Sequence, residues 1–77
     1  MISRKLIYNA NHRGLKEMDV LLGGFANRHM MDLSTENLLT FERLLEEQDA
    51  DILDWCLGKM SAPAEYQGII EMIVNRN

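Results

Sequence analysis

The fold is decided by residues 14–30, GLKEMDVLLGGFANRHM, the most clearly amphipathic stretch of the chain. Apolar residues and one histidine recur there at steps of three and four, on one face: Leu15, Met18, Leu22, Phe25, Ala26 and His29. This spacing is typical of an α-helix that buries one side, because about 3.6 residues complete a helical turn. We therefore expect a long helix from about Gly14 to Met30, packed by this face against the rest of the molecule.

Helical spacing continues on both sides of this segment, and no stretch keeps the strict alternation of a β-strand. Residues 2–11 predict a short first helix, which the polar residues Asn11 and His12 bring to an end. Ser34 is a favourable N-cap for a third helix, because its hydroxyl can accept a hydrogen bond from a free backbone N–H. The inner stripe of that helix is expected to be Leu38, Phe41 and Leu45.

Two further helices are predicted in the C-terminal half. Asp49 or Asp51 is expected to cap a fourth helix, and Gly58 is placed to end it in a left-handed conformation. Pro63 suits the first position of a fifth helix, where its missing N–H is not needed. The inward face of the fifth helix is Tyr66, Ile69, Ile70 and Ile73. The chain is therefore predicted to be all-α, a compact bundle of about five short helices forming one domain over residues 1–77.

Composition agrees with a small globular domain. The chain has 77 residues, of which 47% are hydrophobic and 26% charged, so disorder is not expected. No stretch approaches the ~18 apolar residues of a membrane helix, and the N-terminus lacks the features of a signal or transit peptide. A single cysteine, Cys56, fits a reducing compartment. His12, His29 and Cys56 lack metal-ligand spacing, so we expect a cytoplasmic domain without a metal site or membrane insertion.

Size and charge favour a binding module over an enzyme. A chain this short has little room for a deep substrate pocket, and no Ser–His pair or Gly-rich phosphate loop is found in the sequence. Residues 1–16 carry four basic side chains and no acid, whereas residues 17–56 carry ten acids and two arginines. Because the net charge is −4, the domain would repel phosphates, and nucleic acid is not an expected partner.

Gly14 interrupts the local helical pattern, because glycine costs ~1 kcal/mol relative to alanine inside a helix. It follows Arg13 and precedes Glu17 by about one turn, so the three residues can form a small flat patch edged by a cation and a carboxylate. Alternatively, Gly14 starts the helix and Glu17 reaches back to cap it. The sequence leaves these two interpretations open. For Gly23 and Gly24, close packing against another helix is favoured over a hinge or a binding spot.

The stretch from His12 to Asp19, HRGLKEMD, resembles the Arg-Gly-x-x-Glu signature of the succinate dehydrogenase assembly factors, or flavinators. The resemblance covers nearly the whole chain, with similar blocks in the same order. These blocks are Leu21-Leu22, Phe25-Ala26, Phe41-Glu42-Arg43-Leu44-Leu45, Asp49-Ala50-Asp51 and Asp54-Trp55. The resemblance implies a five-helix bundle that is not an enzyme, and that promotes covalent attachment of FAD to the flavoprotein subunit of succinate dehydrogenase.

The same resemblance implies a partner-binding site. Arg13, Gly14 and Glu17 are expected to dock on the flavoprotein near its flavin, with Arg13 in a directional contact and Glu17 paired with a partner cation or with Arg13. From their position next to these residues, and not from the resemblance, we expect further contacts by His12, Lys16, Asp19, Arg4, Lys5 and Tyr8. The FAD belongs to the flavoprotein, whose own histidine forms the flavin bond, so no stably bound cofactor is expected. We further expect a monomer, cytoplasmic in a bacterium and in the mitochondrial matrix of a eukaryote, although the sequence does not fix the oligomeric state.

Two alternatives stay open at this stage. A generic helical adaptor could bind an unrelated enzyme through the same Arg13-Gly14-Glu17 patch, and the identity of the captured partner would separate the two. The chain could also bind FAD itself and hand it over, although no dinucleotide fingerprint supports this. Whether fumarate reductase is a second client is left open.

Overall fold

The computed structural model of the chain describes residues 2–76, without the side chains of residues 2–6, 30 and 76. Within this range it contains five α-helices, a short 3-10 turn and no β-strand, which confirms the predicted all-α class. In chain order the elements are α1 (Ile2–Asn11), α2 (Lys16–His29), the 3-10 turn η1 (Met30–Asp32), α3 (Thr35–Leu44), α4 (Asp49–Leu57) and α5 (Ala64–Arg76).

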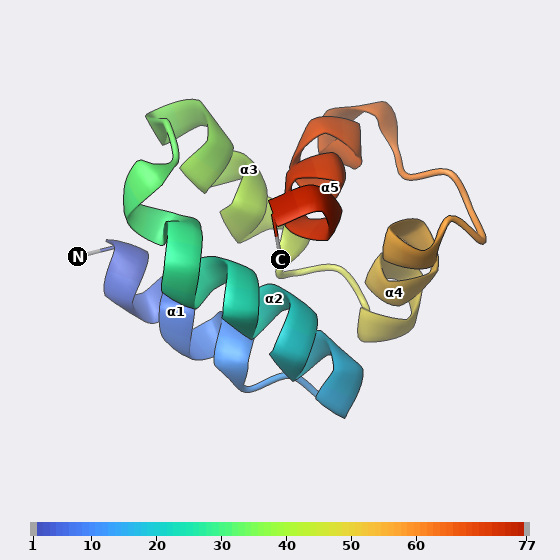
Figure 1. The fold of residues 1–77 in the computed structure, drawn as a ribbon, viewed down its shortest axis with the longest axis horizontal. Helices are drawn as coiled ribbons and strands as arrows, with labels where there is room; N and C mark the ends of the chain where they lie inside the picture. The colour runs from blue at the N-terminus through green and yellow to red at the C-terminus, as the bar shows by residue number, and fades with distance from the viewer. Residues whose placement is uncertain (1, 77) are drawn as a thin grey trace.

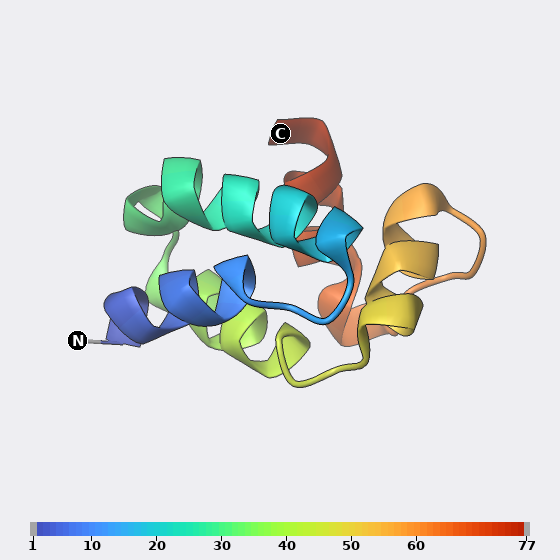
Figure 2. The same ribbon diagram turned by 90° about the horizontal axis from the view of Figure 1, so that it is seen from below.

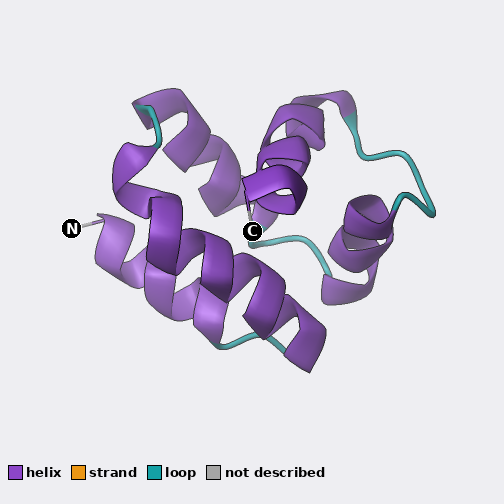
Figure 3. Cartoon of the chain, viewed as in Figure 1, coloured by secondary structure: helices purple, strands orange, loops and turns teal. Residues whose placement is uncertain are grey.

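Two helices, α1 and α2, form an antiparallel hairpin, and the other helices pack beside it. α1 and α2 lie side by side and antiparallel in both orientations (Figure 1 and Figure 2). α3 and α5 pack together, and α4 lies near the start of α2, at the end of the molecule away from the N-terminus. The connections are short except for the one between α4 and α5 (Figure 3). The loop that joins α1 to α2 is therefore brought close to α4.

The core is formed where the inner faces of these helices meet. α2 contributes its predicted face, with Met18, Leu22, Phe25 and Ala26 all buried. The rings of Phe25 and Phe41 lie 5.6 Å apart, which joins α2 to α3. The inward face predicted for α5 is also confirmed by burial: Tyr66, Ile69, Ile70 and Ile73. Two residues of the predicted α2 face are not buried. Leu15 precedes the helix and stays 37% exposed, and His29, the last helical residue, is half-buried.

The predicted start of α2 was wrong by two residues. The helix begins at Lys16, and the carbonyl oxygen of Leu15 accepts the first hydrogen bonds, from the N–H groups of Met18 and Asp19. Gly14 thus lies in a loop before the helix. At the other end α2 finishes at His29, and the chain tightens into η1 from Met30.

The helix caps follow the sequence except at α4. Ser34 caps α3 as predicted, with its Oγ accepting the Asn37 N–H at 3.1 Å. Gly58 ends α4 with φ of 77°, also as predicted. The predicted aspartate cap of α4 was wrong, because Gln48 occupies the N-cap position without a side-chain cap bond and Asp49 is the first helical residue.

The structure also tests the expectations for Pro63 and Gly23. Pro63 lies one residue before α5 instead of at its first position, and its carbonyl oxygen accepts the Tyr66 N–H at 2.9 Å. Gly23 is needed for close packing, as predicted, because a Cβ there would come within 2.9 Å of Asn11 Cγ on α1. None of the described helices is long and apolar enough to cross a membrane.

Candidate functional site

Arg13 clamps the loop before α2 to the loop before α4. Its Nε donates to Asp49 Oδ1 at 2.7 Å, and its two terminal nitrogens donate to the carbonyl oxygens of Leu45 and, at 2.9 Å, Glu47. The Arg13 side chain is only 12% exposed. A guanidinium can bond three acceptors at once because its donors are held in one plane. Arg13 was predicted to contact the partner, but its guanidinium points into the molecule and binds acceptors of this chain.

The carboxylate of Asp49 is held from two sides. Besides the bond from Arg13, its Oδ2 accepts the backbone N–H of Leu15 at 3.0 Å, just before α2 begins. Burial alone would raise the pKa of Asp49, but the hydrogen bonds from Leu15 and Arg13 and the charge of Arg13 together bring the pKa below its ordinary value. Asp49 therefore stays ionised at neutral pH and joins the starts of α2 and α4, which lie next to each other in Figure 1.

Asp19 completes the start of α2 from within the helix. Its Oδ1 accepts the backbone N–H of Arg13 at 2.6 Å. Asp19 and Asp49 thus accept the N–H groups of Arg13 and Leu15, just before α2 begins. In one of the two open interpretations, Glu17 was expected to cap this end of the helix. That alternative was wrong. Glu17 is exposed on the first turn of α2, and the structure shows no hydrogen bond or ion pair of its side chain within residues 2–76.

Gly14 is exposed and lies against the carboxylate that Arg13 binds. A Cβ at position 14 would stand 3.2 Å from Asp49 Oδ2, which is closer than a relaxed contact. Because that oxygen is already fixed by the Leu15 N–H, it has little freedom to move aside. The glycine is thus explained by close approach within the chain, and it leaves bare backbone at the surface next to Lys16 and Glu17, both exposed.

An aromatic pair lies at the end of α1, beside this loop. The rings of Tyr8 and His12 stack with centroids 4.0 Å apart, and His12 Nδ1 donates to the Tyr8 carbonyl oxygen at 2.8 Å. Tyr8 remains 61% exposed, so the stack presents its outer face to solvent. The predicted neighbours Tyr8, His12 and Lys16 are therefore surface residues. The side chains of Arg4 and Lys5 lie outside the described part of the chain.

Tyr66 was not expected to be part of this region. The buried ring of Tyr66 stacks on Trp55, and its hydroxyl donates to Glu47 Oε2 at 2.9 Å. Burial, together with the hydrogen bond to Glu47 and the charge of that residue, raises the pKa of Tyr66 to about 12. Glu47 also provides a carbonyl oxygen to Arg13, so the loop between α3 and α4 is held by α5 on one side and by Arg13 on the other.

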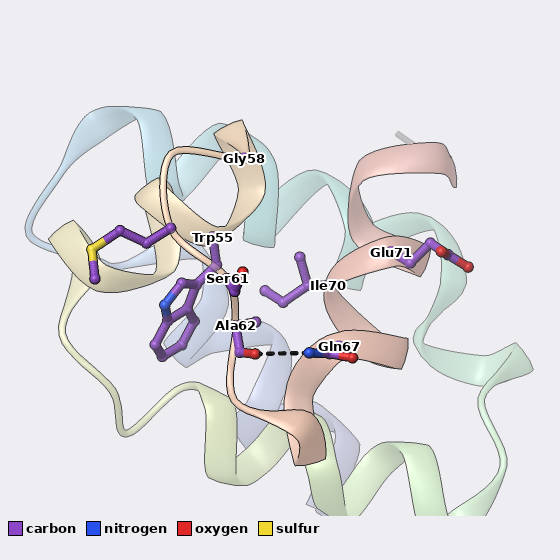
Figure 4. A pocket seen from close by; sticks show the side chains of 8 residues that line it. Trp55, Gly58, Ser61, Ala62, Gln67, Ile70 and Glu71 are labelled. Atoms are coloured by element: carbon purple, nitrogen blue, oxygen red, sulfur yellow. Dashed lines mark hydrogen bonds between the residues drawn. The ribbon is translucent and has the colours of Figure 1, made fainter.

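The structure also contains a crevice away from these residues, between α5 and the loop that follows α4. It has a volume of about 320 Å³ and is lined in part by Trp55, Met60 and Ile70 (Figure 4). Gln67 donates to the Ala62 carbonyl oxygen at 3.1 Å across one part of it. None of the predicted site residues lines this crevice. Among residues 2–76, no group of three or more His, Cys, Asp or Glu side chains is arranged to hold a metal ion.

The chain is similar to known proteins along nearly its whole length. Residues 4–77 match the family described as flavinator of succinate dehydrogenase. A "FAD assembly factor SdhE" of Acetobacter pasteurianus is 39% identical over 62 residues, which are 80% of this chain and 57% of that protein. A second protein of that name, from Colwellia psychrerythraea, is 35% identical over 68 residues, 87% of this chain and 75% of that protein.

A mitochondrial protein is also similar to most of the chain. A "Succinate dehydrogenase assembly factor 2, mitochondrial" of Schizosaccharomyces japonicus is 36% identical over 66 residues, 86% of this chain and 46% of that protein. The chain thus spans about half the length of several curated relatives that it matches. With the match of residues 4–77 and the all-α fold, the chain belongs to the flavinator family of succinate dehydrogenase.

Proposed function

We propose that this protein binds the flavoprotein subunit of succinate dehydrogenase and promotes the covalent attachment of FAD to it. Membership of the flavinator family and the assembly-factor names of its relatives support this proposal. The contact surface, called here the loop surface, consists of Tyr8, His12, Gly14, Lys16 and Glu17. All five are exposed.

The observation that carries the assignment is the inward clamp of Arg13. Because three acceptors within the chain hold its guanidinium, the loop before α2 has a defined shape before any partner arrives. A surface that is already ordered loses less conformational freedom on binding. We therefore assign Arg13 as a positioning residue, together with Asp49 and Asp19, and assign direct contact with the partner to Gly14 and Glu17.

The mechanism requires no catalytic group from this chain. FAD stays on the flavoprotein, which provides the side chain that forms the flavin bond, and the assembly factor stabilises the partner conformation in which the two are aligned. Gly14 allows the partner backbone to approach closely, since no side chain stands there. Glu17 carries the free carboxylate of the loop surface and pairs with a partner cation.

Purified variants test the proposal. Glu17→Ala and Gly14→Arg are expected to weaken binding to the flavoprotein subunit and to slow its flavinylation, while the far-UV circular dichroism stays that of the wild type. The free energy of unfolding of Gly14→Arg is measured as well, because its Cβ stands 3.2 Å from Asp49 Oδ2. Glu36→Ala is the control for Glu17, because Glu36 is also an exposed acid in a first helical turn. Gly68→Arg is the control for Gly14, because open space surrounds Gly68. If both folded variants flavinylate as well as their controls, the loop surface is not the contact surface.

The identity of the partner is tested separately. The affinity-tagged wild-type chain is expected to retain the succinate dehydrogenase flavoprotein subunit when the two are mixed, and a general adaptor would retain a different enzyme in its place. Absence of that complex at micromolar concentrations would reject the proposed function itself.

A further inference from the structure

An apolar groove runs between α2 and α4, next to the loop surface. It has a volume of about 410 Å³ and is lined by Glu17, Val20, Leu21, Leu53 and Leu57. Two of its aliphatic side chains are strongly exposed, Val20 at 67% and Leu57 at 57%. A solvent-exposed groove lined mainly by aliphatic side chains is a candidate contact surface for another protein.

We infer that this groove holds an aliphatic segment of the flavoprotein that carries a lysine or arginine beside its apolar side chains. This inference rests on the proposed function, and it adds a second contact region to the loop surface. The occupant would fill the groove with its apolar side chains and place its cation at the Glu17 end.

Continuity with the loop surface is the first argument. Glu17 belongs to both regions, and positions 17, 20 and 21 share one face of α2 because they are three and four residues apart. Leu53 and Leu57 form the opposite wall with the same spacing on α4. The bond between Asp49 and the Leu15 N–H fixes the starts of the two helices against each other. A partner on the loop surface would therefore meet a preformed groove.

Charge is the second argument. Glu17 is the one charged residue among those lining the groove, and its carboxylate has no hydrogen bond or ion pair with any side chain that the structure describes. A carboxylate beside an apolar surface attracts a cation more strongly than one surrounded by water, because the local dielectric constant is lower. A purely apolar occupant would remove water from Glu17 without compensation, and an acidic occupant would be repelled.

A second copy of the chain fits the groove poorly. A stable dimer buries ~800 Å² on each partner, which is about one sixth of the 4957 Å² surface of this chain and more than five side chains can supply. A symmetric dimer through the groove would also use the same patch on both copies, so two Glu17 carboxylates would be covered and the groove of neither copy would supply a cation. A flavoprotein that also covers the loop surface would bury a larger area than the groove alone, and it could supply the cation that a second copy lacks.

The test compares matched exposed residues inside and outside the groove. Val20→Asn and Leu57→Ser change the groove. Val74→Asn on α5 and Leu39→Ser on α3 are the controls outside it, at a valine that is 45% exposed and a leucine that is 43% exposed. The dissociation constant of each variant for the flavoprotein subunit is measured by calorimetry. We expect Val20→Asn to weaken binding about tenfold, from the loss of one buried aliphatic side chain, and Val74→Asn to stay within about twofold of the wild type.

The cation is tested by salt dependence. The affinity of the wild type is expected to fall as sodium chloride rises from 50 to 500 mM, and Glu17→Gln is expected to reduce that dependence. If Val20→Asn and Leu57→Ser bind as tightly as their controls while the wild type binds, the groove inference is wrong and the proposed function stands. If the wild type does not bind the flavoprotein subunit at all, the proposed function is rejected, and with it the groove inference that rests on it. A wild-type dimer in sedimentation that Val20→Asn dissociates would assign the groove to a second copy and overturn the inference.

Discussion

Replacing Asp49 by asparagine tests whether the Arg13 clamp holds the loop before α2. The substitution keeps the shape of the side chain and removes its charge. Two hydrogen bonds are affected, the 2.7 Å bond from Arg13 Nε and the 3.0 Å bond from the Leu15 N–H. A hydrogen bond to a charged group contributes ~1.5–3 kcal/mol and one between neutral groups ~0.5–1.5 kcal/mol, so each bond loses about 1 kcal/mol.

The expected loss in the free energy of unfolding is therefore about 2 kcal/mol. A domain of this size has a total of roughly 4–12 kcal/mol, so the loss is a large fraction of the whole. It corresponds to a decrease in Tm of about 8–16 °C. The Arg13 side chain is 12% exposed, and leaving its charge without a counterion adds to the cost.

Urea unfolding followed by circular dichroism at 222 nm measures this difference. Asp51→Asn is the matched control, because Asp51 lies in the same first turn of α4 and is exposed. Both substitutions remove a favourable charge from the helix N-terminus, so their difference isolates the contacts of Asp49 with Arg13 and with the Leu15 N–H. If the free energies of unfolding of Asp49→Asn and Asp51→Asn differ by less than about 0.5 kcal/mol, the Arg13 clamp does not stabilise the fold.

The pH dependence gives an independent check on the same carboxylate. In the folded chain the pKa of Asp49 lies below its ordinary value of 3.8. A carboxyl with a lowered pKa stabilises the fold fully above its unfolded pKa and loses that contribution as pH falls through the folded pKa. The advantage of the wild type over Asp49→Asn should thus be constant from pH 7 to about pH 5 and shrink below 3.8. An advantage unchanged at pH 2.5 would contradict the assignment.

The remaining predictions concern other parts of the fold. Gly23→Ala should destabilise the chain by about 1–3 kcal/mol in urea unfolding, because a Cβ there meets α1, whereas Gly68→Ala should stabilise it by about 0.5–1 kcal/mol, since Gly68 lies inside α5 with open space around it. In a Tyr8→Phe variant, Tyr66 should titrate at about pH 12 by absorbance at 295 nm, and its contribution to stability should be lost as pH rises from 10 to 12. Burial raises the pKa of Cys56, so iodoacetamide at about pH 8 should alkylate it more slowly in the folded chain than in urea.

Local patterns in the sequence predicted the helices and much of the core. The spacing of apolar residues was sufficient for α2 and α5, because a helix that buries one face shows it within a few turns. Ser34 and Gly58 acted as predicted, since a helix cap depends on neighbouring backbone groups. These features are local, and a single sequence contains the information for them.

The candidate site was predicted less completely, because its contacts join distant residues. Asp49 was expected to cap its own helix, but Arg13 and Leu15, more than thirty residues earlier, hold its carboxylate. No local pattern distinguishes Asp49 from Asp51, and only their positions in the folded chain assign the contact to one of them. The role of Tyr66 at the Glu47 loop was missed for the same reason.

The most direct test of the account is the covalent flavin fluorescence of the succinate dehydrogenase flavoprotein subunit, observed in denaturing gels of cells with and without the gene for this chain. We expect the fluorescent band to be lost without the gene, to return with the wild-type chain or Glu36→Ala, and not to return with Glu17→Ala expressed at the same level. A band of equal strength in cells that lack the gene would contradict the proposed function.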